Sequence, residues 1–200
     1  MKLIIGEQRI VLGKKTSQDD IIEKINEYLA NGYYFSHFIV DGTEIFDEHE
    51  EYLNLNLDRI KELEVIAKTE KEFMNDVLLS TEVYLKRAKP ELVTLATEFT
   101  VKPTAETWTN FEMLVGGAGW LIDMLAVIVD SNERPTSWEA YVKLSTALQA
   151  ELVKLIEAVE KEQLVHISNS IQNEIMLIFT SLEEEVGKTI DSEGTRENLS

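Results

Sequence analysis

The residues best suited to chemistry lie in the most apolar segment of the chain, residues 113–129, where three glycines surround one alanine. Gly116, Gly117 and Gly119 superficially match a phosphate-binding loop, but the lysine and hydroxyl of such a loop are absent and no strand precedes them. In a helix interior glycine costs about 1 kcal/mol relative to alanine. We therefore predict helix packing or self-association at these glycines and Trp120, with a ligand-binding bend as the alternative.

Asp123 lies near the middle of the same segment. It is either a buried functional carboxylate or a solvent-facing, hydrogen-bonded residue. A membrane span needs roughly 18 to 20 apolar residues, and a central aspartate adds an insertion cost of about 3 kcal/mol. The segment is thus predicted to be a central bundle helix or a self-association surface, and no membrane span is expected.

Three histidines are candidate metal ligands: His37, His49 and His166. None has a second ligand at a recognised spacing; a di-iron bundle needs Glu three residues before His, where Gln163 stands. The acidic residues 47–51 lack the alternating ligands and central glycine of a calcium loop. We expect neither a metal nor another cofactor.

Motifs for covalent catalysis are also missing. The chain has no cysteine, which excludes disulfides, thiolate nucleophiles and iron–sulfur clusters, and it has no Gly-x-Ser-x-Gly or His-Glu-x-x-His motif. Trp108, Trp120 and Trp138 lie in predicted helices, and we interpret them as core or interface anchors rather than as a stacking platform. The expected protein is not an enzyme.

Charge argues against polyanionic partners. The 200 residues carry a formal charge of −18, divided as −6 over the first 69 residues and −12 over the rest. This charge repels nucleic acids and anionic lipid surfaces, and no basic patch offsets it. Residues 1–13 have no secretory pattern, so a cytoplasmic protein is expected.

The first 69 residues alternate short apolar runs with turn signals. Residues 2–6 and 9–13 predict a hairpin, residues 16–29 an amphipathic helix, and residues 33–46 a second hairpin turning at Asp41-Gly42. A short helix within residues 47–54 and a strand over residues 62–68 complete the series.

This element order, together with the opening residues 1–5, resembles the ubiquitin-like β-grasp fold. The resemblance implies a mixed sheet whose first and last strands are parallel and adjacent, with the helix across one face. It also implies a protein-docking role for the opposite face, at positions Ile4, Ile39 and Ile66 with His37 nearby. The diglycine tail of the conjugated modifiers is absent after Thr69, so conjugation is not expected.

From residue 70 onward the apolar pattern is helical. A capping box at Thr69 and Glu72 opens the first helix, Pro90 is predicted to break or kink it, and a further break is predicted at residues 160–163. We expect an antiparallel bundle of four or five helices over residues 70–190 and a frayed polar tail over residues 191–200.

The sequence therefore predicts an α+β protein with a domain at residues 1–69 and a bundle at residues 70–190. The favoured function is a non-catalytic adaptor or scaffold that binds a protein partner, with a homodimer formed through the bundle. The alternative is an enzyme or small-molecule sensor with a ligand pocket inside the bundle near Trp120 and Asp123.

Overall fold

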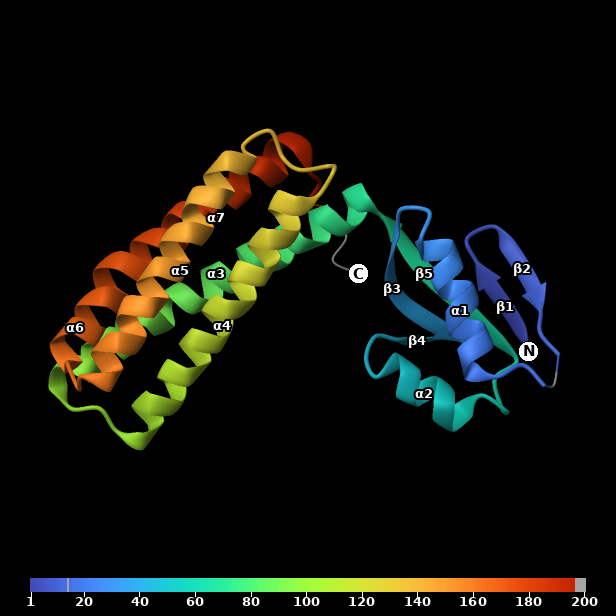
Figure 1. Ribbon diagram of the computed structural model, residues 1–200, viewed down its shortest axis with the longest axis horizontal. Helices are drawn as coiled ribbons and strands as arrows, with labels where there is room; N and C mark the ends of the chain where they lie inside the picture. The colour runs from blue at the N-terminus through green and yellow to red at the C-terminus, as the bar shows by residue number, and fades with distance from the viewer. Residues whose placement is uncertain (14, 197–200) are drawn as a thin grey trace. The chain divides into compact units, whose positions relative to one another are not determined.

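The computed structural model describes residues 1–13 and 15–196 and has a mixed α+β fold (Figure 1). The chain divides into two compact units, Met1–Phe73 and Met74–Ser200. The predicted domain boundary lies after residue 69, where β5 ends and α3 begins. Each unit has its own buried core, so each is described by itself.

The first unit contains a five-stranded mixed sheet in the order β2-β1-β5-β3-β4. Its strands are β1 (Lys2–Ile5), β2 (Gln8–Val11), β3 (Tyr33–Val40), β4 (Thr43–Ile45) and β5 (Glu62–Thr69). β1 pairs antiparallel with β2 and parallel with β5, while β3 pairs antiparallel with both β4 and β5. The parallel pairing of the first and last strands is the arrangement expected from the sequence.

Local signals in the sequence fix the turns and helix starts of this unit. Asp41 and Gly42 both have positive φ, 49° and 86°, as a two-residue hairpin turn of the primed type requires. The Asp41 carboxylate also accepts a hydrogen bond from the backbone N–H of Glu62, at 2.8 Å. Ser17 and Asp20 form a capping box at the start of α1 (Gln18–Leu29).

One face of the sheet is buried beneath helices. The core combines α1 with α2 (His49–Asn56) and the inward side chains of the strands. Its fully or almost fully buried members include Leu3, Ile5, Ile21, Leu53, Leu63 and Val65. Because successive strand residues point to opposite faces, the burial of Leu3 and Ile5 places Ile4 on the outward face.

The register between β3 and β5 shifts between Phe35 and His37. An extra residue at Ser36 changes which side chains point inward, as a β-bulge does. Phe35 and Phe38 therefore both lie on the inward face, with ring centroids 4.9 Å apart, and both contact His49 of α2 edge-on. His37 points outward.

The second unit consists of long helices. They are α3 (Glu70–Val101), which starts in the first unit, α4 (Ala105–Asp130), α5 (Trp138–Glu160), α6 (Leu164–Asn169), the π-helix η1 (Ser170–Ile175) and α7 (Met176–Glu193). α6, η1 and α7 follow one another without intervening residues, so the described chain forms four long helical rods that alternate in direction (Figure 1). Their core includes the fully buried Leu121, Leu125, Tyr141 and Phe179.

The two predicted helix breaks have different outcomes. The break at residues 160–163 is present, because α5 ends at Glu160 and Glu162 takes a positive φ of 53°. At Pro90, where the sequence predicts a break or a kink, there is no break, since α3 runs through it from Glu70 to Val101. Buried Leu85 and Leu92 on either side of Pro90 anchor the helix, and this packing outweighs the one backbone hydrogen bond that proline removes.

The predicted frayed tail, residues 191–200, is described only as far as residue 196. Helix α7 extends to Glu193, and the backbone N–H of Thr195 donates to the Asn75 side chain at 2.8 Å. Arg196 binds two carboxylates. Residues 197–200 lie outside the described residues.

Candidate functional site

The outward face of the sheet carries the four residues predicted to dock a protein. Strand register places Ile4 beside Glu64, and Glu64 beside Ile39. His37 lies beside Ile66 on the neighbouring pair of positions. The structure therefore brings Ile4, His37, Ile39 and Ile66 onto one surface, which we call the outward face.

These residues differ in burial. The three isoleucines are half-buried, while His37 is only 8% exposed. Half-buried isoleucines on the sheet face opposite α1 and α2 leave apolar area in contact with water, which favours association with another apolar surface. This apolar patch is therefore the candidate docking site of the first unit.

Phe46 is a part of the outward face that the sequence alone did not identify. Its ring lies over His37 with centroids 4.4 Å apart, and its side chain is 50% exposed. The signal was available in the alternation of β4, because Ile45 pairs with the inward residue Phe38, so the residue after Ile45 points outward.

His37 has one satisfied and one unsatisfied ring nitrogen. Nδ1 lies 3.0 Å from the Ser36 hydroxyl, but Nε2 is buried and has no hydrogen-bond partner among the described residues. A buried polar atom without a partner costs free energy that a binding partner can recover. Phe46 covers this imidazole, so access to Nε2 depends on the Phe46 side chain.

Charged side chains on the outward face are only partly paired. Lys2 and Glu62 form an ion pair at 2.7 Å across β1 and β5. Within the part of the chain that the structure describes, the carboxylates of Glu64 and Glu44 have no hydrogen-bond or ion-pair partner. Two unpaired acidic groups therefore lie among the isoleucines.

The predicted helix-packing residues are divided between two environments. Gly117 lies against α3, where a Cβ would overlap the hydroxyl of Tyr84, and Trp120 packs on the same tyrosine with ring centroids 5.2 Å apart. Gly116 and Gly119 instead face open space within the described residues. Close helix approach thus explains Gly117 but not the other two glycines.

Helix α4 is long and apolar enough to cross a membrane by length and composition alone. Of its most apolar window, 28% is buried. One such helix is weak grounds for a span, because the core helices of bundles share its length and composition, although core helices are mostly buried. Asp123 is exposed on α4, as the solvent-facing alternative requires.

Trp120 and Asp123 line neither of the two cavities described here. The first cavity, about 360 Å³, lies between α3 and α4 and is lined mainly by apolar side chains, including Tyr84, Met113 and Leu114. Arg87 and Glu91 stand at the same cavity. Neither of these two cavities therefore coincides with the pocket predicted near Trp120 and Asp123.

The second cavity, about 530 Å³, lies where α5 meets α6 and η1, and its lining is rich in polar side chains. The buried Glu151 carboxylate accepts hydrogen bonds from Ser170 at 2.7 Å and from Lys154 at 2.9 Å. Both carboxylate oxygens are thereby hydrogen-bonded, and the bond from Ser170 connects η1 to α5. His166 lines this cavity of the second unit, whereas His37 and His49 belong to the first unit.

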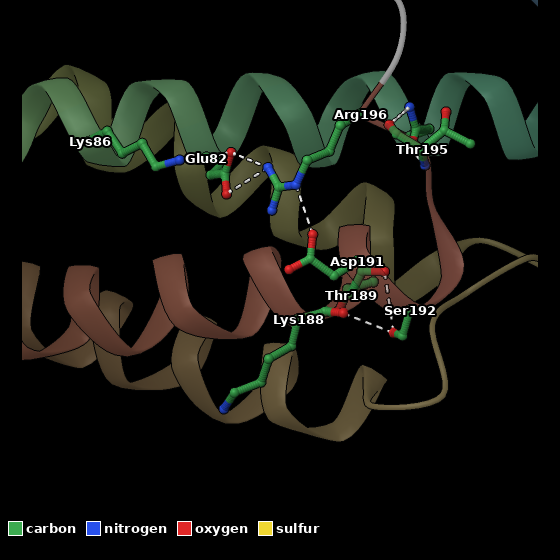
Figure 2. A network of polar contacts seen from close by, with 9 residues as sticks. Glu82, Lys86, Lys188, Thr189, Asp191, Ser192, Thr195 and Arg196 are labelled. Carbon is green, nitrogen blue, oxygen red and sulfur yellow. Dashed lines mark hydrogen bonds and ion pairs between the residues drawn. The ribbon is translucent and has the colours of Figure 1, made fainter.

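A third polar cluster joins the end of the described chain to α3 (Figure 2). Arg196 donates to both oxygens of Glu82, at 3.0 and 3.2 Å, and to Asp191 at 2.7 Å. Burial alone would raise the pKa of Glu82, but hydrogen bonds from Arg196 and Lys86 outweigh it and hold that pKa below its ordinary value.

Metal-binding geometry is absent from the described residues, which contain no group of three or more His, Asp or Glu side chains able to hold an ion. His49 Nε2 lies 3.0 Å from the Ile45 carbonyl, and its ring packs against Phe35. His49 is therefore placed in the core contact between α2 and the sheet.

The fold and these sites define an α+β protein that joins a five-stranded mixed sheet to a helical unit. The chain belongs to the family described as "Domain of unknown function (DUF8042)", whose model matches residues 76–185, more than half of the chain. No curated protein and no solved structure matches it. The matched residues lie in the second unit, so the outward face is outside the family match.

Proposed function

We propose that the protein is a non-catalytic cytoplasmic adaptor or scaffold whose first unit is a ubiquitin-like β-grasp domain and whose outward face binds a protein partner. The observation that carries this proposal is the outward face, where Ile4, Ile39 and Ile66 are half-buried and His37 is buried with a ring nitrogen that has no partner among the described residues. The parallel pairing of β1 with β5, and a helix on the opposite face of the sheet, support the β-grasp interpretation.

Capture from the source cell tests the proposed docking. Full-length protein is cross-linked in cells and purified, and the captured proteins are quantified by mass spectrometry. Ile39→Ala and Ile66→Ala each remove apolar contact area from the outward face and reduce the capture of a specific partner. Ile39→Thr keeps the β-branched side chain that strands favour and gives the same loss.

The matched control is Leu55→Ala, because Leu55 is 71% exposed but belongs to α2, on the other side of the sheet. Circular dichroism and the unfolding temperature establish that each variant is folded. Unchanged capture by folded Ile39 and Ile66 variants contradicts the proposed docking, as does equal loss in the Leu55 variant.

The helical unit contributes self-association in this proposal. Support comes from α4, which is apolar, largely unburied in its most apolar window, and open at Gly116 and Gly119. Light scattering of the full chain measures the solution mass. A dimer that Gly116→Leu converts to a folded monomer agrees with this role, and a wild-type monomer contradicts it.

A second candidate function is small-molecule sensing, which the cavity between α3 and α4 favours. Its volume of about 360 Å³ falls within the range of ligand pockets, roughly 300–1,000 Å³. A thermal-shift screen of metabolites against wild type and Leu114→Trp tests it, since the larger side chain fills the cavity. Absence of any ligand that stabilises only wild type contradicts this function.

A further inference from the structure

We propose that the partner presents a lysine or arginine to the outward face, with its aliphatic stem on Ile39 and its cation between Glu64 and Glu44. This inference rests on the docking function proposed above and adds the chemistry of the partner. The partner is a protein segment in which a basic residue is flanked by apolar residues.

Cross-strand pairing places Ile39 between two acidic residues. Ile39 on β3 pairs with Glu64 on β5 at one side and with Glu44 on β4 at the other. Because neighbouring strands lie about 4.8 Å apart, the two acidic residues flank one isoleucine across roughly 10 Å. All three side chains point outward, since Phe38, Val40 and Val65 point into the core.

Glu64 and Glu44 differ from the neighbouring Glu62 in their ion pairing. Glu62, the next outward acid on β5, already binds Lys2. Glu64 and Glu44 have no such partner among residues 1–13 and 15–196, although Glu64 is half-buried between Ile4 and Ile39. A half-buried carboxylate loses part of its hydration, so an external cation there forms a stronger interaction than at an exposed site.

The apolar surroundings determine the kind of cation. Long basic side chains bury their methylene stems on apolar surface while the charge reaches a polar group. Ile39 offers that surface, and Ile4, Ile66 and Phe46 extend it for apolar neighbours in the partner. The formal charge of −18 also attracts a cationic partner.

Arg9 is the one basic residue in the cross-strand row of the described sheet that contains Glu64 and Ile39, and its charge would repel the partner's cation. It lies on β2 beside Ile4, so Ile4 separates it from Glu64. Arg9 is exposed at the edge strand, whereas Glu64 occupies the centre. The partner's cation therefore belongs at the Ile39 side of the outward face.

A phage-displayed library of random linear peptides is the probe for this inference. The library is selected on the full-length protein, and the enriched peptides are synthesised for titration by fluorescence anisotropy. We expect enriched sequences to share a lysine or arginine flanked by apolar residues. The Glu64→Gln variant weakens their binding about tenfold or more, and added salt weakens binding to wild type.

Glu23→Gln is the matched control, because Glu23 is exposed on α1, which covers the other face of the sheet. The charge-reversed variant Glu64→Lys should prefer a peptide in which glutamate replaces the basic residue. That exchange distinguishes a direct charge contact from a loss of folding.

Dependence on Ile39 tests the docking function, and dependence on Glu64 tests the chemistry of the partner. Peptides that Ile39→Ala abolishes, but that lack a basic residue or bind Glu64→Gln unchanged, leave the docking face standing and overturn the partner chemistry. If no enriched peptide depends on Ile39, both proposals fail. Basic peptides that lose affinity in Ile39→Ala, in Glu64→Gln and in the equivalent Glu44→Gln variant, but not in Glu23→Gln, support both.

Discussion

Arg196 binds Glu82 through both carboxylate oxygens, although 114 positions separate the two residues along the chain. The same guanidinium donates through Nε to Asp191, so it connects α3 with α7 (Figure 2). Asn75 adds two hydrogen bonds to the backbone of Thr195, at 2.8 and 3.0 Å. Hydrogen bonds and ion pairs therefore connect residues 195–196 to the first half of α3.

Replacing Arg196 should lower the stability of the folded protein. Arg196→Ala removes the bonds to Glu82 and Asp191 and leaves Lys86 as the remaining cation of Glu82, so we expect a lower free energy of unfolding in urea. Arg196→Lys should recover only part of the loss, because an ammonium cannot reproduce the planar two-oxygen contact. Equal stability of wild type and Arg196→Ala would contradict a stabilising role.

The matched control for that comparison is Lys161→Ala. Lys161 and Glu157 form an exposed pair one helical turn apart, with both side chains 57% exposed. Such a pair contributes at most about 0.5 kcal/mol, so its removal should change stability little.

Stability should also depend on pH through Glu82. Because hydrogen bonds hold its folded-state pKa below the ordinary value of 4.5, Glu82 stabilises the folded chain above that value. The contribution is lost as the pH falls through the lowered pKa. Glu82→Gln should therefore be less stable than wild type at neutral pH, and the difference should shrink below about pH 4.5. Urea unfolding across this range measures it, and a constant difference would refute it.

The sequence predicts the positions of the strands better than the residues that gather on the outward face. Period-two alternation and the Asp41-Gly42 turn locate the strands, because each signal is local and agrees with its neighbours. The outward positions of Ile4, Ile39 and Ile66 follow from that alternation. Phe46 was missed because its place over His37 depends on the pairing of β4 with β3.

In the helical unit, several features depend on contacts between distant residues, which local sequence signals do not contain. Pro90 predicts a break or a kink, and packing on both sides keeps α3 unbroken. The π-helix at residues 170–175 has no recognised sequence signal, and its first residue, Ser170, binds Glu151 of another helix. The link from Arg196 to Glu82 joins distant positions, so no spacing rule could find it.

The glycines of α4 should respond in opposite ways to alanine. Gly117→Ala puts a Cβ 2.7 Å from Cζ of Tyr84, whose ring is held by Trp120 and Phe179. We expect a loss of about 1–3 kcal/mol in the free energy of unfolding, as for overpacked cores. Gly116→Ala meets open space and should raise stability by up to about 1 kcal/mol, unless α4 associates there.

Chemical denaturation of the two alanine variants measures this difference, and Tyr84→Phe identifies its cause. Removing the hydroxyl that the new Cβ would overlap should recover part of the stability of Gly117→Ala. Similar stabilities for Gly116→Ala and Gly117→Ala would show that α3 and α4 are not held as closely as the structure has them.

The hydrogen bond between Tyr141 and Thr189 gives an asymmetric prediction. Tyr141 is fully buried, and its hydroxyl lies 2.6 Å from Thr189 Oγ1, which itself donates to the Glu185 carbonyl at 3.0 Å. Tyr141→Phe leaves Thr189 bonded to that carbonyl, so it should cost about 0.5–1.5 kcal/mol. Thr189→Val leaves the phenol only a long 3.4 Å contact to Glu185 and should cost more, about 1–3 kcal/mol.

A double-mutant cycle of these two substitutions checks the coupling. Because the residues are in contact, the double variant should lose less stability than the sum of the single losses. Strict additivity would mean that the two hydroxyls do not bind each other in solution.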